Sequence, residues 1–322
     1  MPERTRRREL LKNVAAAAAG SAAIAAAAPA DRVNKRHASV PDGHQGLSAY
    51  AFGSRVWVRV GGRVFTCYRA EPNQKYPYFY PVIGPGTGLP MTDEAALPYR
   101  HHRSLFFGCD HVNGGNYWQQ PLTRGRIASQ GPGIEKESNE KRVTIADRCL
   151  WKRPDREPVI EDTRRFAFTV PSRDQRFIDA DITLIAKVDV HITRTNHSFF
   201  SLRAARDLAP IGGGKLLNAE GASGEKATAG VESAWCGYQG RRLGITESIV
   251  LMDHPANPFS PCKWFTRDYG FISPTPFYWL DENGWHLPQG DSIRLRYRVV
   301  ATNGPIDKGG LARIHTAWSA AT

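Results

Sequence analysis

Alternation of apolar and polar residues recurs along the chain and predicts strands in preference to helices. The longest run covers residues 181–192, where six apolar side chains from Ile182 to Ile192 fall on one face. Polar side chains occupy the other face, with Ile185 as the single exception. A period of two over twelve residues is typical of a β-strand, and no amphipathic helix reproduces it. We therefore expect one strand over 181–192.

Shorter runs with the same period lie on both sides of this strand. The valines of 56–60 alternate with polar or larger residues, and Gly61-Gly62 separates them from a second run over 63–68, which predicts a hairpin. Phe166, Phe168 and Val170 indicate another strand. Apolar positions also alternate over 293–299, where the arginines on the opposite face are expected to be solvated.

Helical patterns are scarce. Thr92–Leu97 is long enough for one turn, which Pro98 would stop, and residues 215–229 have the polar, glycine-containing composition of a long loop. The 30 glycines and 22 prolines fit many turns. We predict an all-β fold, a large antiparallel sandwich with few helices, formed by a single domain over residues 47–320.

The first thirty residues have the composition of an export signal. Arg7-Arg8 precede an Ala-rich run over 15–28, and Ala28-Pro29-Ala30 offers small residues for cleavage. The paired arginines and the mild hydrophobicity favour a twin-arginine signal over a Sec signal. Residues 31–46 are polar and predict a linker. We expect a periplasmic or extracellular protein with no stable membrane insertion after cleavage.

Net charge and cysteine content exclude fewer classes of function than the leader does. The formal charge is +12, and removing the leader's net +3 leaves +9. Because the basic residues are dispersed, a solvated surface is expected and nucleic acid is not expected as a partner. The five cysteines contain no CxxC pair, so buried free thiols are expected, with one disulfide as the alternative.

Two segments carry most of the candidate chemistry. Residues 99–118 hold three of the ten histidines within eleven positions, and residues 232–271 add tryptophans, acidic residues and a further histidine. Flat aromatic rings stack on sugars, and Arg, Asn and Asp bind hydroxyl groups. A histidine adds an acid or base that titrates near neutral pH. We expect both segments to meet in one carbohydrate-binding groove.

Roles follow from residue types. The general acid is expected at His101 or His102, with Asp268 or Glu232 as its carboxylate partner. The expected substrate-binding residues are Arg103, His111, Asn113, Trp118, His254, Asn257, Trp264 and Arg267. The alternatives are structural histidines, core tryptophans, and a metal site made by His101 or His102 with His111. Because no ligand motif supports a metal, no cofactor is expected.

The order of several short motifs resembles a bacterial family labelled "methane oxygenase PmoA". The matching pieces are Tyr76-Pro77-Tyr78-Phe79-Tyr80-Pro81, His101-His102-Arg103, Asp110-His111-Val112-Asn113-Gly114, Trp118, Gly244-Ile245, Asp253-His254-Pro255, Asn257, Trp264 and Arg267-Asp268-Tyr269-Gly270. Ser104 departs from the pattern, which has glycine there. The label is a name here and no guide to function, since a membrane monooxygenase subunit needs several apolar spans.

The resemblance implies a β-supersandwich of the galactose-mutarotase type, a fold whose members commonly bind sugars on a concave sheet. The expected function is an exported carbohydrate-active protein, with an enzyme favoured. Hydrolase, epimerase and lyase chemistries stay open. The alternatives are a non-catalytic glycan-binding module and a metal-dependent oxidoreductase.

Overall fold

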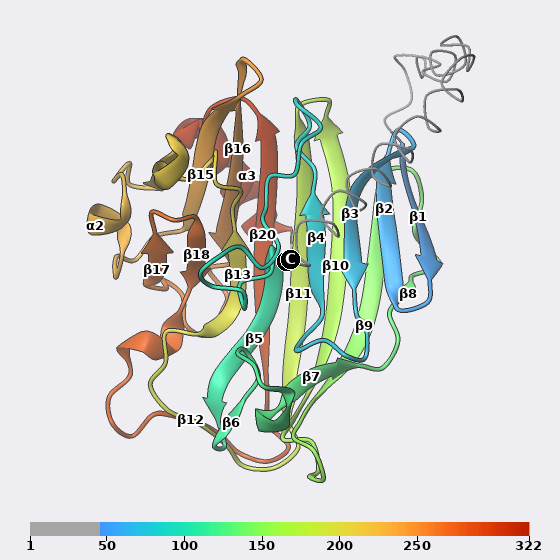
Figure 1. The fold of residues 1–322 in the computed structure, drawn as a ribbon, viewed down its shortest axis with the longest axis vertical. Helices are drawn as coiled ribbons and strands as arrows, with labels where there is room; N and C mark the ends of the chain where they lie inside the picture. Colours follow the sequence, from blue (N-terminus) through green and yellow to red (C-terminus); the bar gives the residue numbers. More distant parts are fainter. Residues whose placement is uncertain (1–45, 322) are drawn as a thin grey trace, which may run out of the picture. The chain divides into compact units, whose positions relative to one another are not determined.

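The computed structural model describes residues 46–321 as two antiparallel sheets (Figure 1). The predicted leader, residues 1–30, and all of the predicted linker except Gly46 lie outside the described residues. The eleven-stranded sheet has the path β1 (Leu47–Phe52), β2 (Arg55–Val60), β3 (Arg63–Arg69), β4 (Tyr78–Val82), β5 (Leu105–Val112), β13 (Ser198–Arg203), β18 (Phe271–Pro274) and β17 (Trp264–Arg267), and β6 (Gly115–Asn116), β12 (Val190–Ile192) and β19 (Trp285–Leu287) lie off this path.

The nine-stranded sheet contains the longest strands. Its order is β14 (Lys215–Asn218), β15 (Trp235–Arg242), β16 (Ile245–Asp253), β20 (Ser292–Asn303), β11 (Gln175–Ala186), β10 (Ile160–Ser172), β9 (Arg142–Lys152) and β7 (Arg126–Ser129), with β8 (Gly133–Ile134) paired to β9. Short 3-10 turns occur at η1 (Leu122–Arg124), η2 (Pro210–Gly212) and η3 (Pro276–Trp279), and the helices are α2 (Glu225–Thr228) and α3 (Lys308–Ala320).

Aromatic side chains from both sheets form the core between them. Phe79 of β4 packs edge-on against Phe166 of β10 with ring centroids 4.7 Å apart, and Phe200 of β13 stacks on Tyr297 of β20 at 5.2 Å. Such contacts add to the hydrophobic burial that holds two sheets together. The predicted all-β, antiparallel fold with few helices is confirmed.

A second, smaller core lies on the other side of the nine-stranded sheet. Along β16, Ile249 and Leu251 belong to the main core, whereas Val250 and Met252 pack with Trp318 of α3. Because successive side chains on a strand point to opposite faces, the strand is buried on both faces and reads as continuously apolar. The helix therefore covers part of the outer face of this sheet.

The predicted strand over 181–192 is wrong in one respect. The first half belongs to β11, which ends at Ala186, and after a bend the chain resumes as β12 in the other sheet. At the break, the backbone NH of Lys187 donates to the carbonyl of Val159 at 3.0 Å. Apolar and polar residues keep alternating from β11 into β12 because each strand buries one face. The sequence pattern therefore does not show that the chain moves to the other sheet.

Three other local predictions are settled by the structure. The hairpin around Gly61-Gly62 is confirmed as β2 and β3. Residues 92–97 form no helical turn and carry isolated bridges instead, and the predicted loop over 215–229 contains β14 and α2. The five cysteines are free and buried, as favoured.

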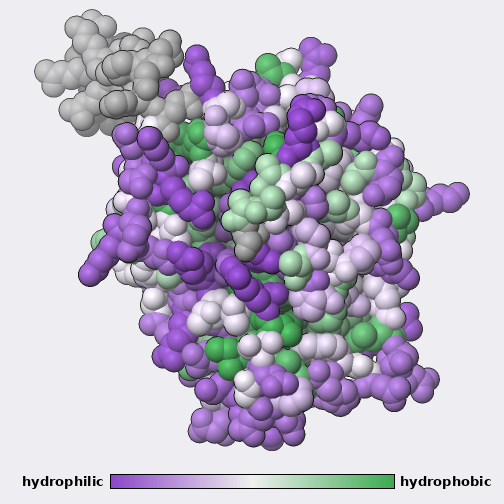
Figure 2. All heavy atoms as spheres, turned by 180° about the vertical axis from the view of Figure 1, so that it is seen from behind, coloured by the Kyte–Doolittle hydropathy of each residue, from purple (hydrophilic) through white to green (hydrophobic). Residues whose placement is uncertain are grey.

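The surface of the described residues is mostly polar. Seen from behind the view of Figure 1, it is largely hydrophilic with small apolar areas (Figure 2). On the outer face of β20, Arg294 pairs with Asp181 and Arg298 pairs with Asp179 of β11, each with a hydrogen bond of 2.8 Å. Within residues 46–321, neither helix has the length and apolar character needed to cross a membrane.

Candidate functional site

Three histidines from two distant segments meet beside β5. His101 and His102 lie on the loop between β4 and β5, and His197 lies just before β13. One ring nitrogen from each lies within 4.8 Å of those of the other two. The His101 ring centroid is 4.4 Å from that of His102 and 5.7 Å from that of His197.

The loop that carries the first two histidines is held by its backbone and by ring stacking. The Tyr76 hydroxyl donates to the His101 carbonyl, and the NH of Ala95 donates to the His102 carbonyl at 3.2 Å. The His102 ring stacks on Phe271 of β18, with centroids 4.1 Å apart. The adjacent histidines can both join the cluster because they lie in a loop, where side chains need not alternate between faces.

The backbone conformation at Ser104 explains why the resemblance noted above places a glycine at this position. Its φ of 56° lies in the left-handed region, which favours glycine. The hydroxyl group donates to the Thr92 side chain at 2.7 Å, and the NH donates to the Asp93 carbonyl at 2.9 Å. These bonds hold a serine in a conformation that glycine adopts freely.

His197 is oriented by a carboxylate that sequence reasoning did not select. Its Nδ1 lies 2.9 Å from Oδ2 of Asp110 on β5, and its backbone NH donates to the Thr195 hydroxyl oxygen at 3.0 Å. The Thr195 hydroxyl also donates to the other Asp110 oxygen. Since a carboxylate accepts, Nδ1 carries a proton, and this bond fixes the orientation of the ring.

Burial keeps the other two histidines neutral at pH 7. It lowers the pKa of His102, which is 2% exposed, to about 2, and the pKa of His101 to about 4, with the neighbouring His197 adding to the latter effect. A general acid must carry a proton, so these directions do not favour the predicted acid role. A neutral imidazole acts instead as a base or as a metal ligand.

Two pockets adjoin at the cluster. The first, of about 590 Å³, is lined by His101 and Trp118, and the second, of about 400 Å³, is lined by Asp110 and His197. Gln119 lines both. A ligand in either pocket therefore reaches an imidazole of the cluster.

The predicted residues of the first segment divide between the pockets and the framework. Arg103 lines the first pocket and His111 lines the second. Asn113 is structural instead, because its amide donates to the Asp189 carbonyl at 2.9 Å and its oxygen accepts from the NH of His191 at 2.7 Å. It fastens the turn after β5 to β12.

The second predicted segment reaches the cluster only through its aromatic part. Tyr269 and Phe271 contact the His102 ring. The carboxylate of Asp268 accepts from the NH of Glu225, and Arg267 pairs with the Glu225 side chain at 3.1 Å. Both side chains therefore contact the first residue of α2. Glu232 forms a backbone bridge with Lys263.

Residues 253–257 make their contacts with β20 and α3. Asn257 bonds to Asp253 at 2.7 Å and to both backbone groups of Arg296, and the His254 ring lies 4.8 Å from that of Trp318. These residues therefore stabilise the packing of this segment against β20 and α3. Trp264 is 0% exposed and its indole NH donates to the Ser233 carbonyl at 2.7 Å, so no face is open for a sugar.

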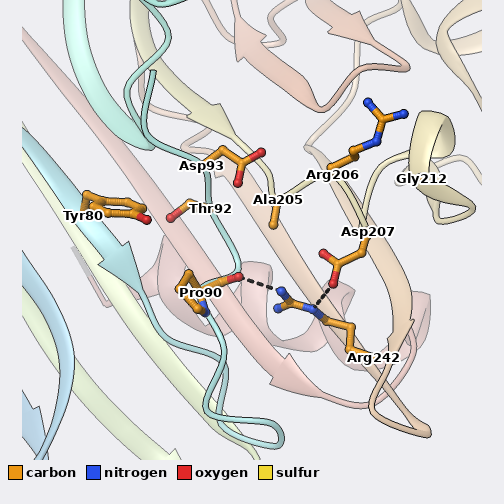
Figure 3. A pocket seen from close by; sticks show the side chains of 9 residues that line it. All are labelled: Tyr80, Pro90, Thr92, Asp93, Ala205, Arg206, Asp207, Gly212 and Arg242. Carbon is orange, nitrogen blue, oxygen red and sulfur yellow. Dashed lines mark hydrogen bonds and ion pairs between the residues drawn. The ribbon is translucent and has the colours of Figure 1, made fainter. Parts of the chain in front are cut away.

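Sequence reasoning missed a further pocket of about 500 Å³, which is lined in part by Thr92 and Asp93 (Figure 3). Its charged lining residues are Asp93, Arg206 and an ion pair between Arg242 and Asp207 at 2.8 Å. Arg242 also donates to the Pro90 carbonyl at 2.7 Å. Its residues come from four separate segments, and no local motif marks them.

The chain is similar to solved structures of sugar epimerases and mutarotase relatives at very low identity. Galactose 1-epimerase from Lactobacillus acidophilus matches with a TM-score of 0.40 and 6% identity, covering 80% of this chain and 98% of that one. A GalM/aldose epimerase homologue from C. elegans matches with a TM-score of 0.32 and 10% identity, covering 82% and 97%. Identities this low carry no information about activity.

Comparison by sequence identifies a family but no characterised relative. No curated protein matches the chain. The family that matches is described only as one of unknown function, and the "methane oxygenase PmoA" label stays a prediction. Because this match covers residues 55–316, the chain belongs to the family of unknown function DUF6807.

Proposed function

We propose that the chain is a carbohydrate-active enzyme whose reaction centre is the cluster of His101, His102 and His197. The observation that carries this proposal is the meeting of three imidazoles, brought from distant segments, at two adjoining pockets. Structural histidines bond to backbone groups, as His191 does to the Asn283 carbonyl at 3.0 Å. The Nδ1 of His102, by contrast, is buried and has no hydrogen-bond partner.

The lining of the first pocket supports a sugar that carries an acidic group. Lys75, Arg100 and Arg103 lie in its wall, and none of its lining residues is acidic. Arg103 lies 3.8 Å from Glu94 and keeps 30% of its side chain exposed. Guanidinium groups bind carboxylates and sulfates or phosphates with paired hydrogen bonds. A uronic acid is the simplest sugar with this chemistry.

The wall also offers groups for neutral parts of a sugar. Gln119 and Gln120 supply amide donors and acceptors. Amide groups of this kind bind hydroxyls. Trp118 lines the same wall but is 0% exposed, so, as for Trp264, its ring offers no open face to a sugar. Hydrolase, epimerase and lyase reactions all fit this description.

The test is turnover on a panel of oligosaccharides, half neutral and half containing uronic acids. The variants are His101→Gln and a matched control, His286→Gln, whose exposed ring stacks on His191 at 4.2 Å outside the cluster. We expect turnover of at least one acidic substrate, a fall of about 100-fold or more in His101→Gln, and no change in the control.

Two results would contradict the proposal. One is equal turnover by the wild type and His101→Gln. The other is saturable glycan binding by the wild type without any product, which would make the chain a binding module.

A further inference from the structure

We infer that His101, His102 and His197 form a binding site for a divalent transition-metal ion of the zinc or copper type. The catalytic role of the ion rests on the proposed function, since the three histidines are the proposed reaction centre. The binding itself can be measured without any substrate. It also replaces the ligand set expected from the sequence, which paired one of the adjacent histidines with His111.

The spacing of the ligand atoms is the first support. One nitrogen from each ring lies within 4.8 Å of the others. A tetrahedral ion about 2.1 Å from each nitrogen places its ligands about 3.4 Å apart. The nitrogens therefore need to approach by up to about 1.4 Å, and the half-buried His101 ring, which lies in a loop, is the one best placed to rotate.

An unsatisfied ring nitrogen is the second support. The Nδ1 of His102 is buried and has no hydrogen-bond partner. A buried polar atom without a partner costs about 1–3 kcal/mol, so such an atom marks a position where a partner is expected. His111, by contrast, places its Nδ1 3.1 Å from the Arg194 carbonyl and is not part of the cluster.

The setting of His197 is the third support. The Asp110 carboxylate holds Nδ1, and the Thr195 hydroxyl holds that carboxylate. A metal-bound histidine commonly gives its other ring NH to a carboxylate, which fixes the ring and makes the ligand nitrogen more basic. The geometry around His197 reproduces that arrangement with protein atoms alone.

The ligand set indicates the type of ion and the type of site. Neutral imidazoles suit zinc, copper, iron and nickel better than magnesium or calcium. Three protein ligands beside a pocket leave a coordination position for water or substrate, as in catalytic metal sites. When bound, such an ion polarises a substrate oxygen or activates a water molecule. The cationic wall then places the acidic group of the sugar beside it.

The experiment measures Zn²⁺ and Cu²⁺ binding to the full chain by titration calorimetry, and Co²⁺ binding by its visible spectrum. The variants are His101→Gln, His197→Gln and Asp110→Asn, with His286→Gln as the matched control. We expect about one ion per chain for the wild type and the control. Affinity should fall by at least about 100-fold in the two histidine variants and by about 10- to 100-fold in Asp110→Asn.

The outcomes separate this inference from the proposed function. No binding by the wild type, or equal binding by His101→Gln, overturns the metal site, whereas turnover that depends on His101 would still support the enzyme. Binding of one ion without turnover supports the metal site and contradicts the enzyme. Thermal unfolding checks that each variant is folded. His101→Gln is the decisive variant, because its partly exposed ring contributes least to the core.

Discussion

Two groups of residues looked alike in the sequence and differ in the structure. His101, His102 and Asp110 belong to one, and Asp253, His254 and Asn257 to the other. In the first, the Nδ1 of His102 is buried without a hydrogen-bond partner, and the cluster adjoins two pockets. In the second, the Asn257 amide donates to Asp253 and to the backbone of β20, and the Asp253 carbonyl lies 2.9 Å from the Nε2 of His315 in α3. The Oδ2 of Asp253 is also buried without a partner, but this group lines neither of those two pockets.

The difference lies in where the hydrogen bonds go. A polar side chain that satisfies backbone groups stabilises the fold and has little left for a ligand. One that is held by its own backbone, with its polar atoms unpaired, is free to bind. Composition does not distinguish these cases, since both groups offer the same residue types.

The largest effect that would test this contrast is expected from Asn257→Ala. The change removes hydrogen bonds at 2.7 Å to Asp253 and at 2.8 and 2.7 Å to the backbone of Arg296, and leaves those buried groups unpaired. We expect a loss of about 3 kcal/mol in the free energy of unfolding, measured with urea. Turnover per folded molecule should not fall. If it does, the second group belongs to the site after all.

A smaller effect is expected from Asp253→Asn, and it depends on pH. Burial raises the pKa of Asp253 to about 7, above its value of about 3.9 in the unfolded chain. The wild type therefore loses stability as pH rises from about 4 through 7, because only the unfolded state ionises freely there. Asparagine does not ionise. The variant should gain about 2 kcal/mol over the wild type between pH 4.5 and pH 8, judged by urea unfolding.

The opposite sign would contradict this account of Asp253. A wild type that becomes more stable with rising pH relative to Asp253→Asn would mean that the carboxylate is ionised in the folded protein.

The smallest effects come from a matched pair of tryptophans, one near each group. Both are buried, but the Trp264 indole NH donates to Ser233 and that of Trp118 has no partner. Trp264→Phe should cost about 1 kcal/mol more stability than Trp118→Phe, because only it breaks a hydrogen bond. Binding of the acidic oligosaccharide, measured by calorimetry, should be the same for both variants, because both rings are 0% exposed. Equal losses of stability would remove the distinction between the two tryptophans.

The fold was predictable from sequence because strand alternation is a local property. The valines of β2 and the arginines of β20 show which residues face the core without any knowledge of the partner strand. Alternation could not show that residues 181–192 divide between two sheets, since both halves bury one face. The helix α3 was missed because Gly309 and Gly310 lower its helix propensity, although it packs well on the sheet.

The site was predictable only in part. His101 and His102 were selected because they are adjacent and surrounded by aromatic residues, and that signal is local. His197 and its carboxylate Asp110 are 87 positions apart and meet through pairing of β5 with β13. Nothing near His197 in the sequence signals a role in a site. Asp110 lies in the first predicted segment, but the sequence does not show that it contacts His197.

The burial of all five cysteines gives the chain an internal reporter of unfolding. Each thiol is free, and burial raises its pKa, to about 11 for Cys67. A protonated, inaccessible thiol does not react with an alkylating reagent, whereas the same group in an opened chain does. Mass spectrometry after a short labelling pulse would therefore count opened molecules directly. Since Cys109 lies on β5 and Cys236 on β15, peptide mapping would show which sheet separates first.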